Sequence, residues 1–216
     1  MRQFIKEFAK ICAETLPTIE PIYEFGSFRP QGQEILADMR SFFPNKKYIG
    51  TDMREGLGVD VILNLHNIDL PSESVGTTLI LETLEHVEFP GKAVEEAYRI
   101  LKPNGILIIS SAMNYPIHNH PSDYWRFTPE AFKSLLRMFS FSIVESLGEN
   151  DFPHSVVGVG FKNSISENTK NEFLKKISVW KTYWDNPPKS RWKKSAKLFI
   201  PPIVLDIYHK FVKIKY

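Results

Sequence analysis

The segment between residues 112 and 127 concentrates side chains that can do chemistry. It holds two histidines, His118 and His120, with Asp123 close behind them. An imidazole titrates near neutral pH and can take a proton from a hydroxyl or an amine, and a nearby carboxylate can orient the ring. We therefore predict that His118 or His120 acts as a general base, with Asp123 as its partner.

The same segment is rich in aromatic side chains. Tyr124 and Trp125 can stack on the apolar face of a sugar ring or of another planar acceptor, and we expect Tyr115 and Arg126 beside them in a substrate site. A structural role stays open as the alternative. In that case Trp125 and Phe127 anchor the loop in the core, and Arg126 pairs with a carboxylate of the body.

A histidine pair with one residue between its members also suggests a metal site. His118 and His120 are not accompanied by a third ligand at a recognisable spacing, and Cys12 is the only cysteine. We therefore expect no metal. We also expect His86 to be a structural histidine rather than a base.

Polar residues and a glycine directly follow the first three predicted strands. In an open α/β sheet, ligands bind beyond the carboxyl ends of the strands. Gly26 allows a tight turn there, Asp52 can accept hydrogen bonds from both ribose hydroxyls, and Asn64 can read the edge of an adenine. Each also has an ordinary structural reading, as a turn or a helix cap. Together, in this order, they describe a cleft for a nucleoside.

Short apolar runs without clean alternation predict the strands that would position these residues. Such runs are typical of strands buried on both faces of a parallel sheet, and strand–helix alternation favours a doubly wound α/β fold. The predicted strands are residues 22–25, 48–50, 59–63, 75–81 and 106–109, with a closing pair at 141–146 and 156–161. The predicted helices are an opening one from Phe4 to Leu16, then residues 33–43, 92–101, and one that starts at Thr128-Pro129-Glu130.

Four segments of the chain together resemble the class I S-adenosylmethionine-dependent methyltransferases, and most closely the methyltransferase type 11 group. They are Glu24-Phe25-Gly26-Ser27, Gly50-Thr51-Asp52, Leu84-Glu85-His86-Val87 and residues 97–105, AYRILKPNG. The resemblance spans about residues 20–163. It implies a mostly parallel, Rossmann-like sheet of seven strands, with S-adenosylmethionine as the cofactor.

The resemblance also implies roles for individual residues. Glu24, Gly26 and Ser27 would lie along the methionine part of the cofactor, and Asp52 would bind its ribose. The remaining residues expected in the cofactor site are Met53, Asn64 and Leu65 at the adenine, together with Phe28 and Glu82.

The loop after Gly26 departs from the usual family pattern. Its residues 27–32 carry bulky side chains where other members of the family usually have further glycines. A subset of the family is similar at residues 26–33 and 118–129, and its members often occur among enzymes of cell-surface glycan synthesis. We therefore expect methyl transfer to an oxygen or nitrogen of a small or glycan-linked acceptor. A non-catalytic cofactor-binding module and a nucleic-acid methyltransferase remain the alternatives.

The length and composition of the chain limit the classes of protein to which it can belong. The chain has 216 residues, which fits one compact domain with an extension. A single cysteine excludes an internal disulfide and favours a reducing, cytoplasmic location. The first residues carry charges where a signal peptide would be apolar, and no apolar run is long enough to span a membrane.

Charge and aromatic content divide the chain near residue 163. Residues 164–216 hold 12 Lys or Arg against 4 Asp or Glu and contain three of the four tryptophans, whereas residues 1–163 have a net charge of −6. We predict a methyltransferase domain at 1–163 and a basic helical extension at 164–216. The extension either covers the cleft or mediates a homodimer, or its residues 175–211 contact an anionic membrane surface; nucleic acid is the less favoured partner.

Overall fold

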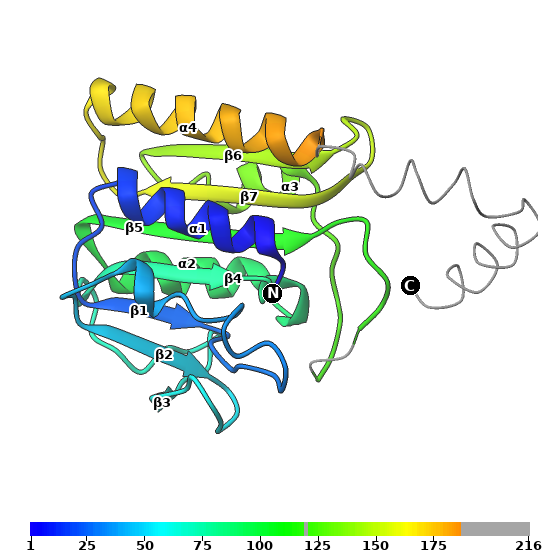
Figure 1. The fold of residues 1–216 in the computed structure, drawn as a ribbon. Helices are drawn as coiled ribbons and strands as arrows, with labels where there is room; N and C mark the ends of the chain where they lie inside the picture. The colour runs from blue at the N-terminus through cyan, green and yellow to red at the C-terminus, as the bar shows by residue number, and fades with distance from the viewer. Residues whose placement is uncertain (119–120, 187–216) are drawn as a thin grey trace, which may run out of the picture.

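The computed structural model describes residues 1–118 and 121–186, and the described part forms one seven-stranded sheet with helices on both faces (Figure 1). The strand order is β3-β2-β1-β4-β5-β7-β6. The strands are β1 (Ile22–Phe25), β2 (Tyr48–Asp52), β3 (Val61–Ile62), β4 (Val75–Leu81), β5 (Leu101–Ala112), β6 (Phe141–Gly148) and β7 (Pro153–Phe161). The predicted seven-stranded, Rossmann-like sheet is confirmed.

Parallel pairing brings the carboxyl ends of neighbouring strands to the same edge of the sheet. β1 pairs in parallel with β2 and β4, β2 with β3, and β4 with β5, whereas β7 runs antiparallel between β5 and β6. All residues of β4 are buried, which agrees with a strand covered on both faces. The carboxyl ends of β1, β2, β4 and β5 therefore meet at one edge of the sheet.

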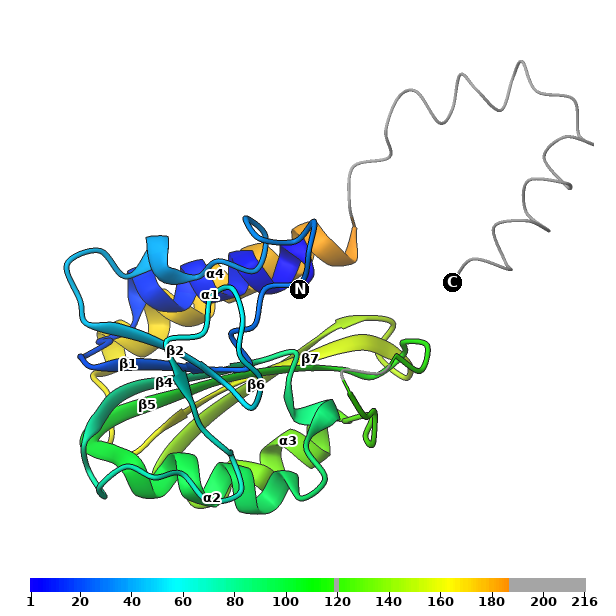
Figure 2. The same ribbon diagram turned by 90° about the horizontal axis from the view of Figure 1, so that it is seen from below.

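Helices cover both faces of the sheet (Figure 2). One face carries α1 and α4, and the other carries α2 and α3. The helices are α1 (Gln3–Thr15), α2 (Pro90–Ile100), α3 (Pro129–Leu135) and α4 (Glu167–Asp185), with short 3₁₀ helices η1 (Arg40–Phe42) and η2 (Leu84–His86). Thr128 caps α3 as predicted, because its hydroxyl accepts a hydrogen bond from the Ala131 N–H at 3.2 Å.

The helix predicted at residues 33–43 is wrong. Turns occupy this stretch, followed only by the three-residue η1, and Ile35 is 85% exposed. The Asp38 carboxylate accepts hydrogen bonds from the Arg40 N–H and from the Arg29 guanidinium. A short acidic side chain that binds nearby backbone in this way competes with helix formation. No helix N-terminus therefore faces the cleft after β1.

Helix α4 lies in the predicted extension and packs beside α1 (Figures 1 and 2). Trp180 is 4% exposed, contacts Phe8, and donates its indole N–H to the Phe4 carbonyl at 3.0 Å. Trp184 donates to the Glu7 carboxylate at 2.8 Å. Two of the extension's tryptophans thus serve packing within the chain, while the division at residue 163 stays a prediction.

The rest of the predicted extension, residues 187–216, lies outside the described residues, so the proposed contacts of 175–211 are tested only up to residue 186. Among the helices of the described part, none is long and apolar enough to cross a membrane.

Candidate active site

A cavity of about 280 Å³ opens at the carboxyl edge of the sheet. Its volume is near the lower end of the range for small-molecule sites, about 300 Å³. The predicted site residues that line it are Glu24, Gly26, Phe28, Asp52, Met53, Asn64, Leu65, Glu82, Tyr115 and His118. One cavity therefore joins most of the predicted cofactor residues to part of the predicted catalytic loop.

Gly26 makes the turn at the end of β1. Its φ is +81°, a conformation that residues with a side chain rarely adopt. A Cβ atom at this position would lie 2.1 Å from Oγ1 of Thr83, which follows β4. The glycine therefore lets the end of β1 and the residue after β4 approach closely at the cavity.

Asp52 ends β2 with its carboxylate at the cavity. Its Oδ1 accepts hydrogen bonds from the backbone N–H and from Nε of Arg54, at 3.0 and 3.1 Å. The Arg54 guanidinium also lies over the Phe28 ring, 4.6 Å from its centre. The carboxylate is thus held in place by a turn that fixes one of its oxygens, an arrangement suited to binding ribose hydroxyls.

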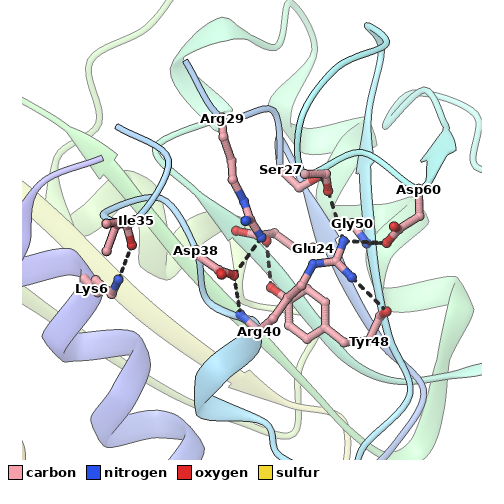
Figure 3. Close-up of polar contacts among 11 residues, drawn as sticks. Lys6, Glu24, Ser27, Arg29, Ile35, Asp38, Arg40, Tyr48, Gly50 and Asp60 are labelled. Atoms are coloured by element: carbon pink, nitrogen blue, oxygen red, sulfur yellow. Dashed lines mark hydrogen bonds and ion pairs between the residues drawn. The ribbon is translucent and has the colours of Figure 1, made fainter. Parts of the chain in front are cut away.

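The bulky loop after Gly26 does not fill the cavity with a charged side chain. Arg29 turns to the Asp38 carboxylate, 2.6 Å away (Figure 3). Ser27 donates its hydroxyl to the Gly58 carbonyl at 3.0 Å. Of the predicted cofactor residues, Ser27 is the one that does not line the cavity. Its hydroxyl instead ties the loop to the segment between β2 and β3.

The predicted adenine residues lie along the cavity wall, Met53 directly after β2 and Asn64 and Leu65 after β3. Leu65 is buried, and Met53 is largely exposed. Asn64 Oδ1 accepts the His66 N–H at 2.9 Å, so its carbonyl oxygen closes a turn and its amide group is the part left to contact a base.

Glu24 is a buried carboxyl at the cavity wall, and the Tyr48 hydroxyl donates to it at 2.7 Å (Figure 3). Burial raises the pKa of Glu24 to about 7, because the charged form loses its hydration. The hydrogen bond from Tyr48 and the nearby Arg29 and Arg40 oppose this rise. Glu24 therefore titrates close to neutral pH.

Glu82, directly after β4, is bound by Arg2. Two hydrogen bonds, of 2.7 and 2.8 Å, join the guanidinium to the carboxylate. Glu82 also has a φ of +52°, which is uncommon for a residue with a side chain and is associated with functional sites.

Glu85 is a cavity residue that sequence reasoning did not select. Its side chain is almost fully buried, and the Ser111 hydroxyl donates to its Oε2 at 2.7 Å. Burial raises the pKa of Glu85 to about 8, with a further contribution from the negative charge of Glu82. Its backbone carbonyl accepts the N–H groups of Tyr124 and Trp125, so this turn also supports the loop after β5.

Within that loop, Asp123 connects two predicted site residues. Its side chain is 1% exposed and accepts two hydrogen bonds from Arg126, at 2.5 and 2.7 Å. Nδ1 of His118 lies 3.2 Å from Asp123 Oδ2. The Arg126 guanidinium holds the pKa of Asp123 well below its usual range, so the carboxylate stays charged beside His118. His120 lies outside the described residues.

The aromatic residues of the loop divide between the two roles considered from the sequence. Phe127 is buried in the core, as the anchoring alternative expects. Tyr124 and Trp125 are about half exposed and do not line the cavity, and the Trp125 indole donates to the Glu88 carbonyl at 3.1 Å. Tyr115 does line it, with its ring 5.0 Å from that of His118.

The fold is shared with solved methyltransferase structures. One is an S-adenosylmethionine-dependent methyltransferase of Thermotoga maritima, described as a possible histamine N-methyltransferase (20% identity, TM-score 0.52, covering 74% of this chain and 92% of that one). Another is the 1,6-didemethyltoxoflavin-N1-methyltransferase of Burkholderia thailandensis, with bound 1,6-didemethyltoxoflavin and S-adenosylhomocysteine (16% identity, TM-score 0.56, 74% and 79%). A comparison with curated proteins found no similar sequence.

Residues 36–109, which include β2 to β4 and most of β5, match a family model described as a methyltransferase domain. The matched residues are those of a methyltransferase domain, and the solved structures share the fold of the chain around them. The Gly26 turn and the Asp52 carboxylate, which the family resemblance assigns to the cofactor, line the same cavity.

The cavity brings together residues from six separate places in the sequence. Arg2, Thr83, Glu85 and His86 line the cavity without having been predicted there. Glu85 and His86 belong to the family-like segment after β4, and this position was the signal that could have selected them. Arg2 has no such signal, because it reaches the cavity only through the packing of α1 on the sheet.

Proposed function

We propose that this methyltransferase transfers a methyl group to an oxygen or nitrogen of a small acceptor bound beside His118. The observation that carries the proposal is the single cavity that contains both Asp52 and His118. In the proposed arrangement, the adenine lies by Asn64 and Leu65, the ribose by Asp52, and the methionine part by Glu24 and Gly26.

The cofactor, when bound, supplies a methyl group made electrophilic by its sulfonium. The task of the chain is then to hold the acceptor in line with the carbon–sulfur bond, which in well-oriented systems lowers the barrier by about 7–11 kcal/mol. With the cofactor bound, the cavity residues would hold the acceptor with a lone pair towards the methyl carbon, and the carbon–sulfur electron pair would stay on sulfur. His118, oriented by Asp123, takes the acceptor proton.

The cavity wall carries little net charge, which favours a neutral acceptor. The carboxylates of Glu82 and Asp52 are paired with Arg2 and Arg54, and burial raises the pKa values of Glu24 and Glu85 to about 7 and 8. The phosphates of a nucleic acid would find both arginines of the wall already engaged, and this disfavours a nucleic-acid substrate. A sugar ring linked to a glycan remains compatible, with Tyr115 lining the cavity and Trp125 half exposed outside it.

The experiment is calorimetry with S-adenosylhomocysteine, followed by an acceptor screen with S-adenosylmethionine and mass spectrometry. The screen includes amines, among them histamine, together with phenols and sugars. Methylation that depends on His118 supports the proposal. Tight cofactor binding with no methylation across the screen would favour a non-catalytic module instead.

A further inference from the structure

Three potential metal ligands meet in the acceptor part of the cavity. Glu85 and His86 lie in η2 after β4, and His118 lies in the loop after β5. One ligand atom from each lies within 4.8 Å of the other two. The rings of His86 and His118 are 4.8 Å apart between centres. We propose that Glu85, His86 and His118 bind one divalent ion of a first-row transition metal.

The backbone around the two histidines sets which ring nitrogen can bind a metal. Nδ1 of His86 is 2.6 Å from the Ser122 carbonyl, and Nδ1 of His118 is 3.1 Å from the Pro116 carbonyl. A carbonyl oxygen only accepts, so both Nδ1 atoms carry the proton. This leaves Nε2 as the coordinating atom in each ring. Metal-binding histidines characteristically donate their other ring N–H to a carbonyl or a carboxylate in this way.

The third ligand, the Glu85 carboxylate, is also held in place by a hydrogen bond. The Glu85 carboxyl is 1% exposed, and the Ser111 hydroxyl fixes its Oε2 at 2.7 Å. A carboxyl buried this deeply either keeps its proton or is charged beside a cation or a metal ion. Arg2, a basic residue of the cavity wall, is already bound to Glu82 through two hydrogen bonds and to the His154 carbonyl through a third. A metal ion would therefore supply the positive charge that favours the ionised form of Glu85.

The ligand set selects the class of metal. Two imidazoles with one carboxylate form the set found for iron, zinc and related ions, whereas magnesium and calcium prefer oxygen ligands. Three protein ligands also leave open positions on the ion. His118 and His120 have no third ligand at a recognisable spacing in the sequence, which is why no metal is expected from the sequence alone. The fold brings two further ligands, Glu85 and His86 after β4, to His118.

The effect that a bound metal ion would have on the reaction rests on the proposed function, methyl transfer to an acceptor in this cavity. An acceptor hydroxyl bound at an open position of the ion would lose its proton more readily, because a bound cation lowers the pKa of an attached oxygen. His118 would then hold the metal, and the acceptor proton would leave to water. This narrows the acceptor to one that presents a hydroxyl, or two neighbouring oxygens, to the ion.

The test is titration of the tag-free full chain with Co²⁺, followed by visible absorption, with Zn²⁺ binding by calorimetry beside it. We expect saturation at one equivalent. Glu85→Gln and His118→Asn should each weaken binding by at least about 10-fold. His66→Gln is the matched control, since His66 lines the same cavity outside the cluster and accepts the Phe89 N–H instead, and it should leave metal affinity unchanged.

Absence of saturable Co²⁺ binding, or equal binding by the wild type and both cluster variants, would overturn the metal site. His118→Asn keeps the test decisive if Glu85→Gln does not fold, because His118 lies on a partly exposed loop. S-adenosylhomocysteine binding is measured in the same samples with chelator. Cofactor binding without metal binding removes this inference alone, whereas metal binding without cofactor binding removes the proposed function.

Discussion

Arg2 and Glu82 are 80 residues apart in the sequence and form a two-bonded ion pair at the cavity, with Nε–Oε2 and Nη2–Oε1 distances of 2.7 and 2.8 Å. The Arg2 guanidinium also lies 5.3 Å from the centre of the Tyr115 ring. The pair therefore links the start of α1 to the end of β4 and to the loop after β5.

This ion pair should stabilise the fold. The two side chains are 20% and 14% exposed, so solvent screens them only in part. We expect Arg2→Met to lower the free energy of unfolding by about 1–3 kcal/mol, because Glu82 loses its charged partner. Urea denaturation measures the effect. Lys10→Met, which removes an exposed pair with Glu14, should change it by less than about 0.5 kcal/mol.

Asp52→Asn should weaken S-adenosylhomocysteine binding about 10- to 100-fold. The reason is the loss of charge-assisted hydrogen bonds to the ribose, each worth about 1.5–3 kcal/mol. Calorimetry measures the affinity. The control is Asp60→Asn, whose carboxylate binds Arg40 and the Gly50 N–H and does not line the cavity. Equal affinity of the Asp52 variant and the wild type would contradict the ribose assignment.

Gly26→Ala and Gly32→Ala separate backbone strain from steric conflict. Both glycines have a φ near +80°, but a Cβ at Gly26 meets Thr83 Oγ1 at 2.1 Å, whereas a Cβ at Gly32 meets nothing within 4 Å. We expect Gly32→Ala to cost about 1 kcal/mol of stability. Gly26→Ala should cost about 1–3 kcal/mol more and abolish cofactor binding. Stability is measured by thermal and urea unfolding. If Gly26→Ala and Gly32→Ala lose similar amounts of stability, the close approach of Gly26 to Thr83 is contradicted.

Glu24 should make the fold less stable as the pH rises. Burial raises its pKa to about 7 in the folded state, from 4.5. The contribution of Glu24 to the stability of the fold is therefore fully present below about pH 4.5 and is lost as the pH rises through 7. The reason is that the Glu24 carboxyl ionises at a lower pH in the unfolded chain than in the folded one. The loss is on the order of 3 kcal/mol at 1.36 kcal/mol per pKa unit.

Glu24→Gln should remove the part of the pH dependence that Glu24 contributes, while the Gln side chain still accepts the Tyr48 hydrogen bond. Urea denaturation at several pH values between 4.5 and 8 tests it. Glu130→Gln, at an exposed position, should keep the wild-type slope. Parallel curves for Glu24→Gln and the wild type would mean that burial is not the cause. Glu85 contributes in the same direction, so the variant flattens the curve only in part.

Trp180→Ala should lower the free energy of unfolding by about 3–5 kcal/mol, since it removes a buried ring from the contact between α4 and α1. Val179→Ala, on the exposed side of the same helix, should change it by less than about 0.5 kcal/mol. A small effect at Trp180, measured by urea denaturation, would indicate that α4 does not stabilise the domain.

The strand positions and the residues at their ends could be predicted from the sequence. Buried parallel strands are uniformly apolar, and their carboxyl ends meet at one edge, so Gly26, Asp52 and Asn64 could be assigned to one cleft before any contact was known. The helix predicted at 33–43 failed because the pattern of apolar residues does not record the hydrogen bonds that Asp38 makes with its neighbours.

The sequence by itself determined three features: the strands of the sheet, the edge of the sheet at which the predicted cofactor residues lie, and the chemical character of the loop after β5. Each of these depends on local patterns of residue type. Only the tertiary structure decided the contacts between distant segments. It placed Arg2 on Glu82, and it brought His118 to Glu85 and His86. Such contacts depend on how helices and loops pack across the whole sheet, and no local spacing encodes them.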